Sequence, residues 1–316
     1  MTTPLYAQEI YLLERYSSPE YFDSMRRAWE TMLSHVEDCL ARFMTQLPAD
    51  YRNRPLPMQP DVVWGQRVLP NFRRTSLVLD DGFIKLTHGD ASGLFAAAGV
   101  NGGVRGQREF SSDWFDEVDP DAGGLYHELL YKADMYASNI SATVEAGWPQ
   151  TVLSTDYSTR HQGPLDAPAE WPKYELDVAE RIRTGEPVKE SGVYLPDIDD
   201  SCAQFLVAGK PAPPALIGFD GQQYVSANLA IWTRVRRVEG ESVADGLADL
   251  SAATEVRQSV RVPGGDVCPR SGWWFTPSRA ASRRYFNQGE SFPIVEGSEY
   301  GVTFWQWDVD QSHPQL

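Results

Sequence analysis

Cysteine is scarce in this chain of 316 residues, and Cys39, Cys202 and Cys268 lie far apart in the sequence. A disulfide framework needs several paired cysteines, and a zinc site needs cysteines or histidines at short, regular spacings. Neither pattern is present, so we expect no disulfide framework and no metal site. We expect all three cysteines to be buried free thiols.

Long apolar runs are also lacking. No stretch approaches the roughly 18 to 20 apolar residues that a membrane-spanning helix requires, so no membrane association is expected. Residues 1–16 carry Glu9, Glu14 and Arg15 and do not show the basic-then-apolar order of a secretory signal peptide. These two absences predict a cytoplasmic protein.

Basic residues are outnumbered in this chain. It has 28 Lys and Arg against 44 Asp and Glu, which gives a formal net charge of −16. Nucleic-acid binding depends on basic side chains that release phosphate counterions, so no nucleic-acid ligand is expected. The same negative field accelerates association with a basic partner protein. Acidity also keeps proteins in solution, and that alternative stays open.

Catalytic and metal-binding motifs are incomplete wherever they begin. His127-Glu128 starts like a zinc-protease helix, but Tyr131 stands where the second histidine belongs. The glycine-rich run 99–106 lacks the lysine and hydroxyl residue of a phosphate loop, and a flexible loop is expected there. Residues 119–130 begin like a calcium loop but end on leucine. We expect no enzyme and no cofactor, with an unrecognised pair of carboxylates as the alternative.

The first half of the sequence has helical periodicity. Ser18 is the expected N-cap of a helix that begins at Pro19, because the first turn of a helix tolerates a missing N–H. The apolar residues of this helix recur at steps of three and four: Phe22, Met25, Trp29, Met32, Val36, Leu40 and Phe43. This spacing indicates an amphipathic helix of about seven turns. Further helices are predicted over 72–87, 125–146 and, as a short stretch, 174–183.

The second half of the sequence contains a repeat at a fixed offset of 80 residues. Ser191-Gly192 matches Ser271-Gly272. The other matched pairs are Phe205 with Tyr285, Gly209 with Gly289, Pro213 with Pro293, Gly221 with Gly301, and Tyr224 with Phe304. Glycine and proline fix backbone direction, and aromatic residues fill a core. The repeat therefore duplicates a scaffold without catalytic side chains, which favours recognition over catalysis.

The residues around these matches are β-prone. Runs bounded by turn residues occur at 193–195, 230–235 and 301–307. Residues 201–208 and 280–288 are expected to form one or two helical turns, one segment in each copy. Each copy is therefore predicted to contain a strand, a short helix, a glycine-marked turn and a further strand.

The predicted fold class is α+β. We expect a helical, bundle-like domain over 1–185 and a β-rich domain over 186–316. The β-rich domain is expected to contain the two similar copies, at 186–240 and 266–316.

Two acidic clusters are the candidate binding residues. The first has five acids within nine residues: Asp113, Asp116, Glu117, Asp119 and Asp121. Trp114 and Phe115 lie among them, and aromatic anchors within an acidic loop suit a surface that binds a basic protein. The alternative is a solvated loop whose Trp114 packs into its own core.

The second cluster occurs in the first copy only and consists of three acids: Asp197, Asp199 and Asp200. These acids are candidate contacts for the same kind of partner. One of them is alternatively the cap of the helical turn expected near Ser201.

The second copy is rich in tryptophan: Trp273, Trp274, Trp305 and Trp307. Exposed tryptophans stack on sugar rings, so a module that binds carbohydrate or peptidoglycan is an alternative function. Buried tryptophans would instead fill the core of a small β unit, which is their more usual role. Trp305 and Trp307 are two residues apart and should point to one face of a strand.

Several segments carry a resemblance to a known group of proteins. In the C-terminal half they are RTGEP (183–187), SGVY (191–194), CAQFLVAGKPAP (202–213), GWW (272–274), GESFP (289–293) and WQW (305–307). In the N-terminal half they are WGQRVLPN (64–71) and Gly89-Asp90. Through these segments the chain resembles the immunity proteins of bacterial polymorphic toxins, specifically immunity protein families 71 and 72.

The resemblance implies a cytoplasmic antitoxin without a cofactor. Such proteins bind and neutralise a toxin encoded beside them, often one delivered by type VI secretion. The implied partner is a toxin domain with DNase activity, a nuclease of the His-Me finger kind that includes the Gly-His-His motif. The resemblance supplies no toxin-contacting residues, so the two acidic clusters stay the candidate contacts.

Overall fold

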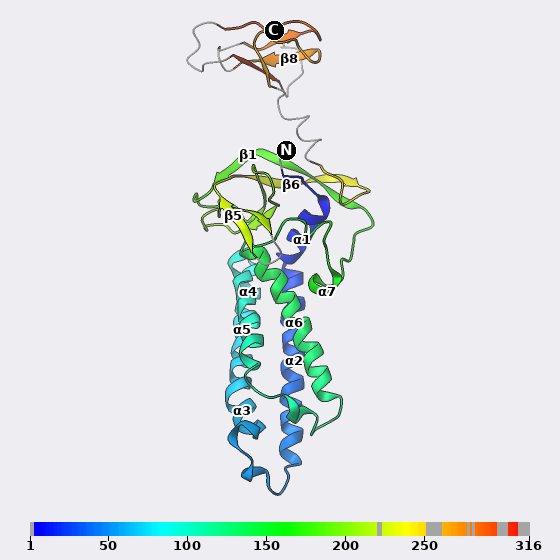
Figure 1. Ribbon diagram of the computed structural model, residues 1–316, viewed down its shortest axis with the longest axis vertical. Coiled ribbons are helices and arrows are strands. Elements are labelled where there is room, and N and C mark those ends of the chain that lie inside the picture. The colour runs from blue at the N-terminus through cyan, green and yellow to red at the C-terminus, as the bar shows by residue number, and fades with distance from the viewer. Residues whose placement is uncertain are drawn as a thin grey trace. The chain divides into compact units, whose positions relative to one another are not determined.

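The computed structural model divides into two compact units, unit 1 (Met1–Ala248) and unit 2 (Asp249–Leu316), and each is described by itself. The structure describes residues 3–219, 223–250, 261–276, 279, 282–295 and 303–308. Helices precede antiparallel sheets along the chain, which confirms the predicted α+β class (Figure 1). The expected boundary at residue 185 lies inside unit 1, because the strands on either side of it belong to one sheet.

Unit 1 begins with a bundle whose long helices run side by side (Figure 1). Its α-helices are α1 (Ala7–Tyr16), α2 (Pro19–Thr45), α3 (Pro60–Val63), α4 (Leu69–Thr87), α5 (Ala97–Gln107), α6 (Ala122–Val144) and α7 (Thr159–Gln162). Its other helical turns are η1 (Tyr51–Asn53), η2 (Leu56–Met58), η3 (Trp64–Val68), η4 (Ala91–Ala96) and η5 (Asp113–Phe115). The helices predicted from Pro19, over 72–87 and over 125–146 are confirmed as α2, α4 and α6.

Helix α2 begins as its sequence predicts. The hydroxyl oxygen of Ser18 accepts a hydrogen bond from the N–H of Tyr21 at 3.2 Å, and Pro19 is in the first turn. All but Leu40 of the predicted apolar stripe is buried: Phe22, Met25, Trp29, Met32, Val36 and Phe43. The indole N–H of Trp29 donates to the carbonyl oxygen of Phe72 at 3.1 Å, which ties α2 to α4.

The prediction of a flexible loop over 99–106 is wrong, because these residues lie in α5. Val100 and Val104 are buried and give the helix an apolar face. Gly103 lies against Trp29, and a Cβ atom at this position would be 2.8 Å from the indole ring. Close packing on α2 therefore requires this glycine, and tertiary contacts override the low helix propensity of the segment.

Four antiparallel strands form the sheet of unit 1. In spatial order they are β1 (Trp171–Arg183), β6 (Ile231–Val243), β2 (Gly192–Pro196) and β3 (Gln204–Leu206). The predicted helical stretch 174–183 is wrong, since it lies in β1. Arg236 on β6 reaches Asp177 at 2.5 Å and Glu180 at 2.7 Å, so pairing with β6 gives the acids of β1 their partners.

The helical turns predicted over 201–208 and 280–288 are also wrong. The first segment contains β3, whose residues are all buried and which pairs with β2. The second contains β9 (Arg284–Phe286) of unit 2. In each case pairing with a neighbouring strand decides the conformation of a short segment whose propensity is ambiguous.

Unit 2 repeats the strand order of unit 1. Its strands are, in spatial order, β7 (Arg261–Pro263), β10 (Phe304–Trp307), β8 (Gly272–Phe275) and β9. The N–H of Gly209 donates to Val188 and the N–H of Gly289 donates to Cys268, both at 2.8 Å. Both glycines have positive φ, 78° and 86°, which other residues rarely adopt. The repeat in the sequence is therefore a duplication of the structure.

The offset between the copies changes before the last strand. Arg183 pairs with Ile231 in unit 1, and Pro263 pairs with Phe304 in unit 2. Ile231 and Phe304 are thus equivalent, and the match of Tyr224 with Phe304 is wrong. The offset falls from 80 to 73 because the chain of unit 1 is seven residues longer before its last strand, where it contains the hairpin of β4 (Ala215–Phe219) and β5 (Tyr224–Asn228). The predicted match of Gly221 with Gly301 lies outside the described residues.

One tryptophan in each unit occupies an equivalent core position. The indole N–H of Trp232 donates to the carbonyl oxygen of Pro213, and that of Trp305 donates to Pro293, both at 2.8 Å. Among the described residues of unit 2, a buried core cluster is formed by Cys268, Trp274, Phe286, Phe292 and Trp305. Trp307 packs against this core, so Trp305 and Trp307 face it together as their spacing predicts.

Candidate functional site

The first acidic cluster follows α5 and precedes α6. It comprises η5 and the turn that leads into Ala122. Of its two aromatic residues, Trp114 is 5% exposed and Phe115 is fully buried. Of the two predicted alternatives for Trp114, the structure places its side chain in the core. A mostly exposed aromatic anchor at this position is therefore excluded.

An aromatic cluster lies beneath the acids. Its members come from five elements or turns along the chain: Phe43, Tyr51, Trp64, Trp114, Phe115 and Tyr126. Trp114 stacks on Phe115 with a centroid distance of 4.1 Å, and Phe115 stacks on Tyr126 at 4.8 Å. The indole N–H of Trp64 donates to the carbonyl oxygen of Ser111 at 2.9 Å. These contacts hold the acidic segment in one conformation.

The acidic residues of this segment lie at the surface, unlike its aromatic residues. Asp113, Asp116, Glu117 and Asp121 are exposed, and Asp119 is half-buried. The guanidinium of Arg54 donates to both carboxylate oxygens of Glu117, at 2.9 and 3.0 Å. Arg42 lies 3.5 Å from Asp119. Within the described part of the chain, the other three acids take part in no ion pair.

A pocket of about 370 Å³ adjoins these acids. It is lined by Arg54, Pro57, Met58, Pro60, Trp64, Ser111, Asp113, Trp114 and Glu117. Met58 is 64% exposed, so an apolar side chain lies at the surface next to acidic ones. The indole Nε1 of Trp114 is buried and has no hydrogen-bond partner within the described residues. We call the acids of 113–121 and this pocket the acidic tip.

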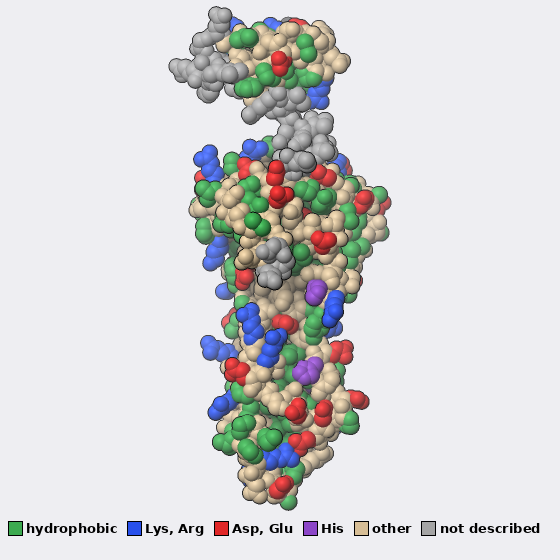
Figure 2. All heavy atoms as spheres, in the orientation of Figure 1, with side chains coloured by type: hydrophobic (Ala, Val, Ile, Leu, Met, Phe, Trp, Pro, Cys, Tyr) green, Lys and Arg blue, Asp and Glu red, His purple; other side chains and the backbone are tan. Residues whose placement is uncertain are grey.

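The acidic tip lies at the end of the bundle remote from the sheet of unit 1, near α3 (Figure 1). Acidic and hydrophobic side chains gather over this end of the molecule in Figure 2. Arg54 and Met58 were not predicted as site residues, because only the folded chain brings 54–60 beside 111–117. The available signal was the run PLPMQP at 55–60, an apolar and proline-rich segment outside any predicted helix.

The second acidic cluster has a structural role in part. The carboxylate of Asp197 accepts a hydrogen bond from the N–H of Ile231 at 2.7 Å, which joins β2 to the start of β6. Asp200 has a positive φ of 57°, and its carbonyl oxygen accepts from Gly218 at 3.0 Å. Asp199 is exposed in the same turn. The cluster precedes β3, so the predicted helix cap near Ser201 is wrong.

The structure does not bring the two acidic clusters together. Helix α6 begins directly after the first cluster, and its 23 residues span roughly 35 Å. Beyond its end, the backbone N–H of Trp148 donates to the side chain of Gln204 at 3.2 Å, close in sequence to the second cluster. The two clusters therefore lie toward opposite ends of α6 and do not form one continuous contact patch.

The four tryptophans named above in unit 2 are either buried or in contact with an arginine. Trp274 is fully buried and Trp305 is 3% exposed. The other two are half-buried, and arginines lie over their rings: Arg283 is 4.5 Å from the ring centre of Trp273, and Arg270 is 3.6 Å from that of Trp307. Packing therefore buries two of the four rings, and an arginine covers one face of each of the other two, which leaves less ring surface on which a sugar could stack.

Metal-binding side chains do not gather in the part of the chain that the structure describes, where no group of three or more could hold an ion. Cys39, Cys202 and Cys268 are buried and free, as their scarcity predicts. No family model matches the chain, and neither a curated protein nor a solved structure matches it. Every helix among the described residues is too short or too polar to cross a membrane.

Proposed function

We propose that this chain is an immunity protein that binds and neutralises a cognate secreted toxin in the cytoplasm. The observation that carries the proposal is the acidic tip, where exposed carboxylates lie on a fixed aromatic base and three of them have no ion pair within the described part of the chain. A preorganised surface of this kind loses little conformational entropy on binding. The sequence resemblance to immunity families 71 and 72 agrees with this role.

The proposed partner is a basic nuclease domain of the His-Me finger kind, delivered by type VI secretion. Its basic surface would meet Asp113, Asp116 and Asp121, the acids of the tip that have no ion pair among the residues described by the structure. An arginine or lysine of the toxin would enter the adjoining pocket, with its aliphatic stem on Met58 and its charge near Asp113. The net charge of −16 would steer the encounter. This mode of inhibition needs no cofactor and no catalysis.

The proposal is tested with the product of the reading frame next to this gene. That product is expected to be toxic when it is expressed alone and harmless when this chain is co-expressed. The two purified proteins should form a stoichiometric complex, and nuclease activity should fall to zero at one equivalent. A product that stays toxic and does not bind this chain contradicts the proposal.

Charge reversal at the acidic tip should slow toxin association. The variant Asp113→Lys, Asp116→Lys, Asp121→Lys leaves the ion pairs of Glu117 and Asp119 intact. At low ionic strength we expect its association rate constant to fall about 10-fold to 100-fold, and its salt dependence to flatten. Stopped-flow measurement at several salt concentrations gives both quantities.

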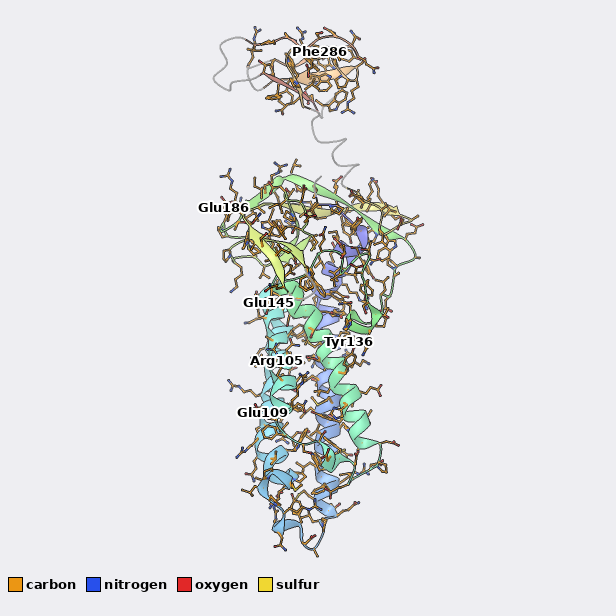
Figure 3. The ribbon with its side chains drawn as sticks, viewed as in Figure 1. Arg105, Glu109, Tyr136, Glu145, Glu186 and Phe286 are labelled. Carbon is orange, nitrogen blue, oxygen red and sulfur yellow. The ribbon has the colours of Figure 1, made fainter. Side chains whose placement is uncertain are left out.

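A matched control separates the local patch from the net charge. Asp81, Glu145 and Glu239 are exposed acids outside the acidic tip, and none of them has an ion pair among the described residues. Glu145 lies at the end of α6 next to the sheet (Figure 3). Reversal of these three acids changes the net charge equally and should slow association much less. Equal slowing by both variants would discard the acidic tip as the interface.

A further inference from the structure

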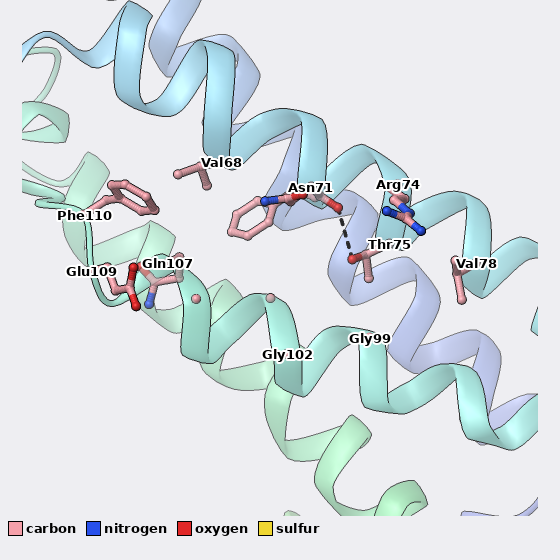
Figure 4. A pocket seen from close by; sticks show the side chains of 13 residues that line it. Val68, Asn71, Arg74, Thr75, Val78, Gly99, Gly102, Gln107, Glu109 and Phe110 are labelled. Carbon is pink, nitrogen blue, oxygen red and sulfur yellow. Dashed lines mark hydrogen bonds between the residues drawn. The ribbon is translucent and has the colours of Figure 1, made fainter. Parts of the chain in front are cut away.

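A second surface of unit 1 has the opposite character. It is a groove of about 480 Å³ between α4 and α5 (Figure 4). The α4 side is formed by Val68, Asn71, Phe72, Arg74, Thr75 and Val78, and the α5 side by Gly99, Gly102, Gly103, Gly106 and Gln107. Glu109 and Phe110 lie at one end. We call this surface the α4–α5 groove.

The floor of the groove on α5 consists of four glycines, and packing in the core explains one of them. Among them only Gly103 is required by the core, because of Trp29. A Cβ atom at Gly102 or Gly106 would meet nothing within 4 Å, and one at Gly99 would make an ordinary 3.6 Å contact with Thr75. None of these three has a positive φ. Glycine destabilises a helix relative to alanine, so the fold itself gains nothing from them.

Open glycines let another backbone approach closely. The three open glycines, Gly99, Gly102 and Gly106, are three and four residues apart and therefore share one face of α5. Small residues at this spacing allow two helices to pack with their backbones near each other. The α4 side of the groove runs from Val68 to Val78, which spans roughly 15 Å, or between two and three helical turns. The groove thus has the length and the floor for a short helix.

Helix α4 has exposed apolar side chains, and one of them lines the groove. Val78 lines the groove and is 42% exposed, and Leu77 next to it is 67% exposed. Ile84, two turns further along α4, is 56% exposed. Val78 is the one of these three side chains that lines the groove, and an exposed apolar side chain in a groove is a contact that a binding partner can cover.

The rim of the groove is basic, although the chain as a whole is acidic. Arg74 on α4 lines the groove. Arg67 in η3 directly precedes the lining residue Val68, and Arg105 on α5 directly precedes the lining residue Gly106. All three are exposed, and none has an ion pair within the described residues. Arg105 and Glu109 lie along the α5 side of the bundle in Figure 3, and Glu109 is the one acid that lines the groove. We call Arg67, Arg74 and Arg105 the rim arginines.

We propose that the α4–α5 groove binds an amphipathic helix of a partner protein. The apolar face of that helix packs on Val78 and the glycine floor, and its acidic flank pairs with the rim arginines. Helix-in-groove recognition of this kind uses anchors at intervals of three and four residues. The inference does not rest on the proposed function, because the groove and the acidic tip share no lining residue.

An acidic helix fits this surface better than nucleic acid does. Proteins that bind duplex DNA commonly neutralise about 6 to 10 phosphates, and three arginines are too few. A long polyanion would also extend over the acidic remainder of a chain with net charge −16. A short helix stays within the groove, where screening over about 8 Å limits the repulsion from distant acids.

The test uses the full chain and three fluorescent probes. Two synthetic helical peptides of about 18 residues share an alanine and leucine face and carry either glutamate or lysine on their flanks. The third probe is a DNA duplex. Anisotropy titrations should show that the glutamate peptide binds at least about tenfold more tightly than the lysine peptide. Absence of binding by the glutamate peptide, or equal binding of both peptides, overturns the proposal, and preferential DNA binding replaces it with a nucleic-acid site.

Filling the floor locates the binding. The variant Gly102→Leu, Gly106→Leu places side chains in open space and should weaken binding of the glutamate peptide at least about tenfold. The Tm of the variant protein should stay at or above that of the wild type. Gly124→Leu is the control, since a Cβ on this exposed glycine of α6 also meets nothing within 4 Å. It should leave peptide binding unchanged. Unaltered affinity in the groove variant overturns the proposal.

Discussion

Replacement of Glu9 by glutamine is expected to raise the free energy of unfolding by about 3 kcal/mol at pH 8. Glu9 lies on α1 and is 4% exposed. Burial raises the pKa of its carboxyl from 4.5 to about 7, although a hydrogen bond donated by Ser154 at 2.6 Å opposes the rise. Above pH 7 the folded chain must hold a buried charge that glutamine does not carry.

The sign follows from proton binding in the two states. Below pH 4.5 the folded and the unfolded chain both hold the proton, so Glu9 contributes no pH dependence. Between pH 4.5 and 7 the unfolded chain releases the proton first, and the stability of the wild type falls as the pH rises. Above pH 7 the carboxyl of Glu9 is ionised in both the folded and the unfolded chain, and the stability of the wild type has fallen by its full amount. Burial also raises the pKa of Glu14 on the same helix, which acts in the same direction.

Urea unfolding at a series of pH values between 4 and 8 checks this prediction. The Glu9→Gln variant should lose most of the decline in stability, because the amide oxygen still accepts from Ser154 and carries no charge. Glu128→Gln on α6 is the matched control, since this side chain is exposed and should change stability by only a few tenths of a kcal/mol. A parallel decline in wild type and Glu9→Gln would contradict the assignment.

The long helices could be predicted because their signals are local. Ser18 and Pro19 define where α2 begins, and the apolar spacing from Phe22 to Phe43 defines the face that it buries. The duplication was also visible, since glycines with positive φ such as Gly209 and Gly289 are needed in each copy. Local backbone geometry and one-sided burial leave a pattern in sequence order.

The errors come from contacts between distant segments. Residues 174–183 have no decisive local signal, and pairing with Arg234 and Arg236 on β6 makes them a strand. The run 99–106 reads as a loop until Trp29 of α2 is seen to require Gly103. Hairpin β4–β5 shifts the offset of the last strand, which a fixed 80-residue match cannot reveal.

The acidic residues of the candidate site could be predicted from the sequence, but the residues that surround them could not. The acids of 113–121 were identified from their density, and the structure places most of them at the surface. The orientation of Trp114 was open, because alternation with acids suits both an anchor and a buried ring. That Arg54 and Met58 belong to the same site could not be predicted, since about 60 residues separate them from Glu117 and Trp114.

Replacement of Trp305 by alanine is expected to unfold unit 2 at 25 °C. Removal of a buried tryptophan costs about 3–5 kcal/mol, and short domains have little more stability than that. Trp305 contacts Phe286 and Phe292 at centroid distances of 4.8 and 5.6 Å. Its indole N–H also donates to the carbonyl oxygen of Pro293, which would lose its partner.

The equivalent change in unit 1 should have a different outcome. Trp232→Ala removes the same ring and the same kind of hydrogen bond, but unit 1 has a far larger core, which includes the helical bundle. We therefore expect Trp232→Ala to lower the unfolding temperature of unit 1 without abolishing its cooperative transition. The two variants compare one interaction in two domains of different size.

Calorimetry and indole N–H signals in NMR spectra distinguish the outcomes. In Trp305→Ala the transition of unit 2 should disappear and the indole signal of Trp274 should move to the position of an unfolded chain, while that of Trp29 stays in place. Phe304→Ala is the control on the same strand, since Phe304 is 42% exposed and its loss should be tolerated. A simultaneous loss of the Trp29 signal would mean that the two units unfold as one. The duplicated sheet of unit 2 would then not be a folding unit of its own, which would contradict the prediction.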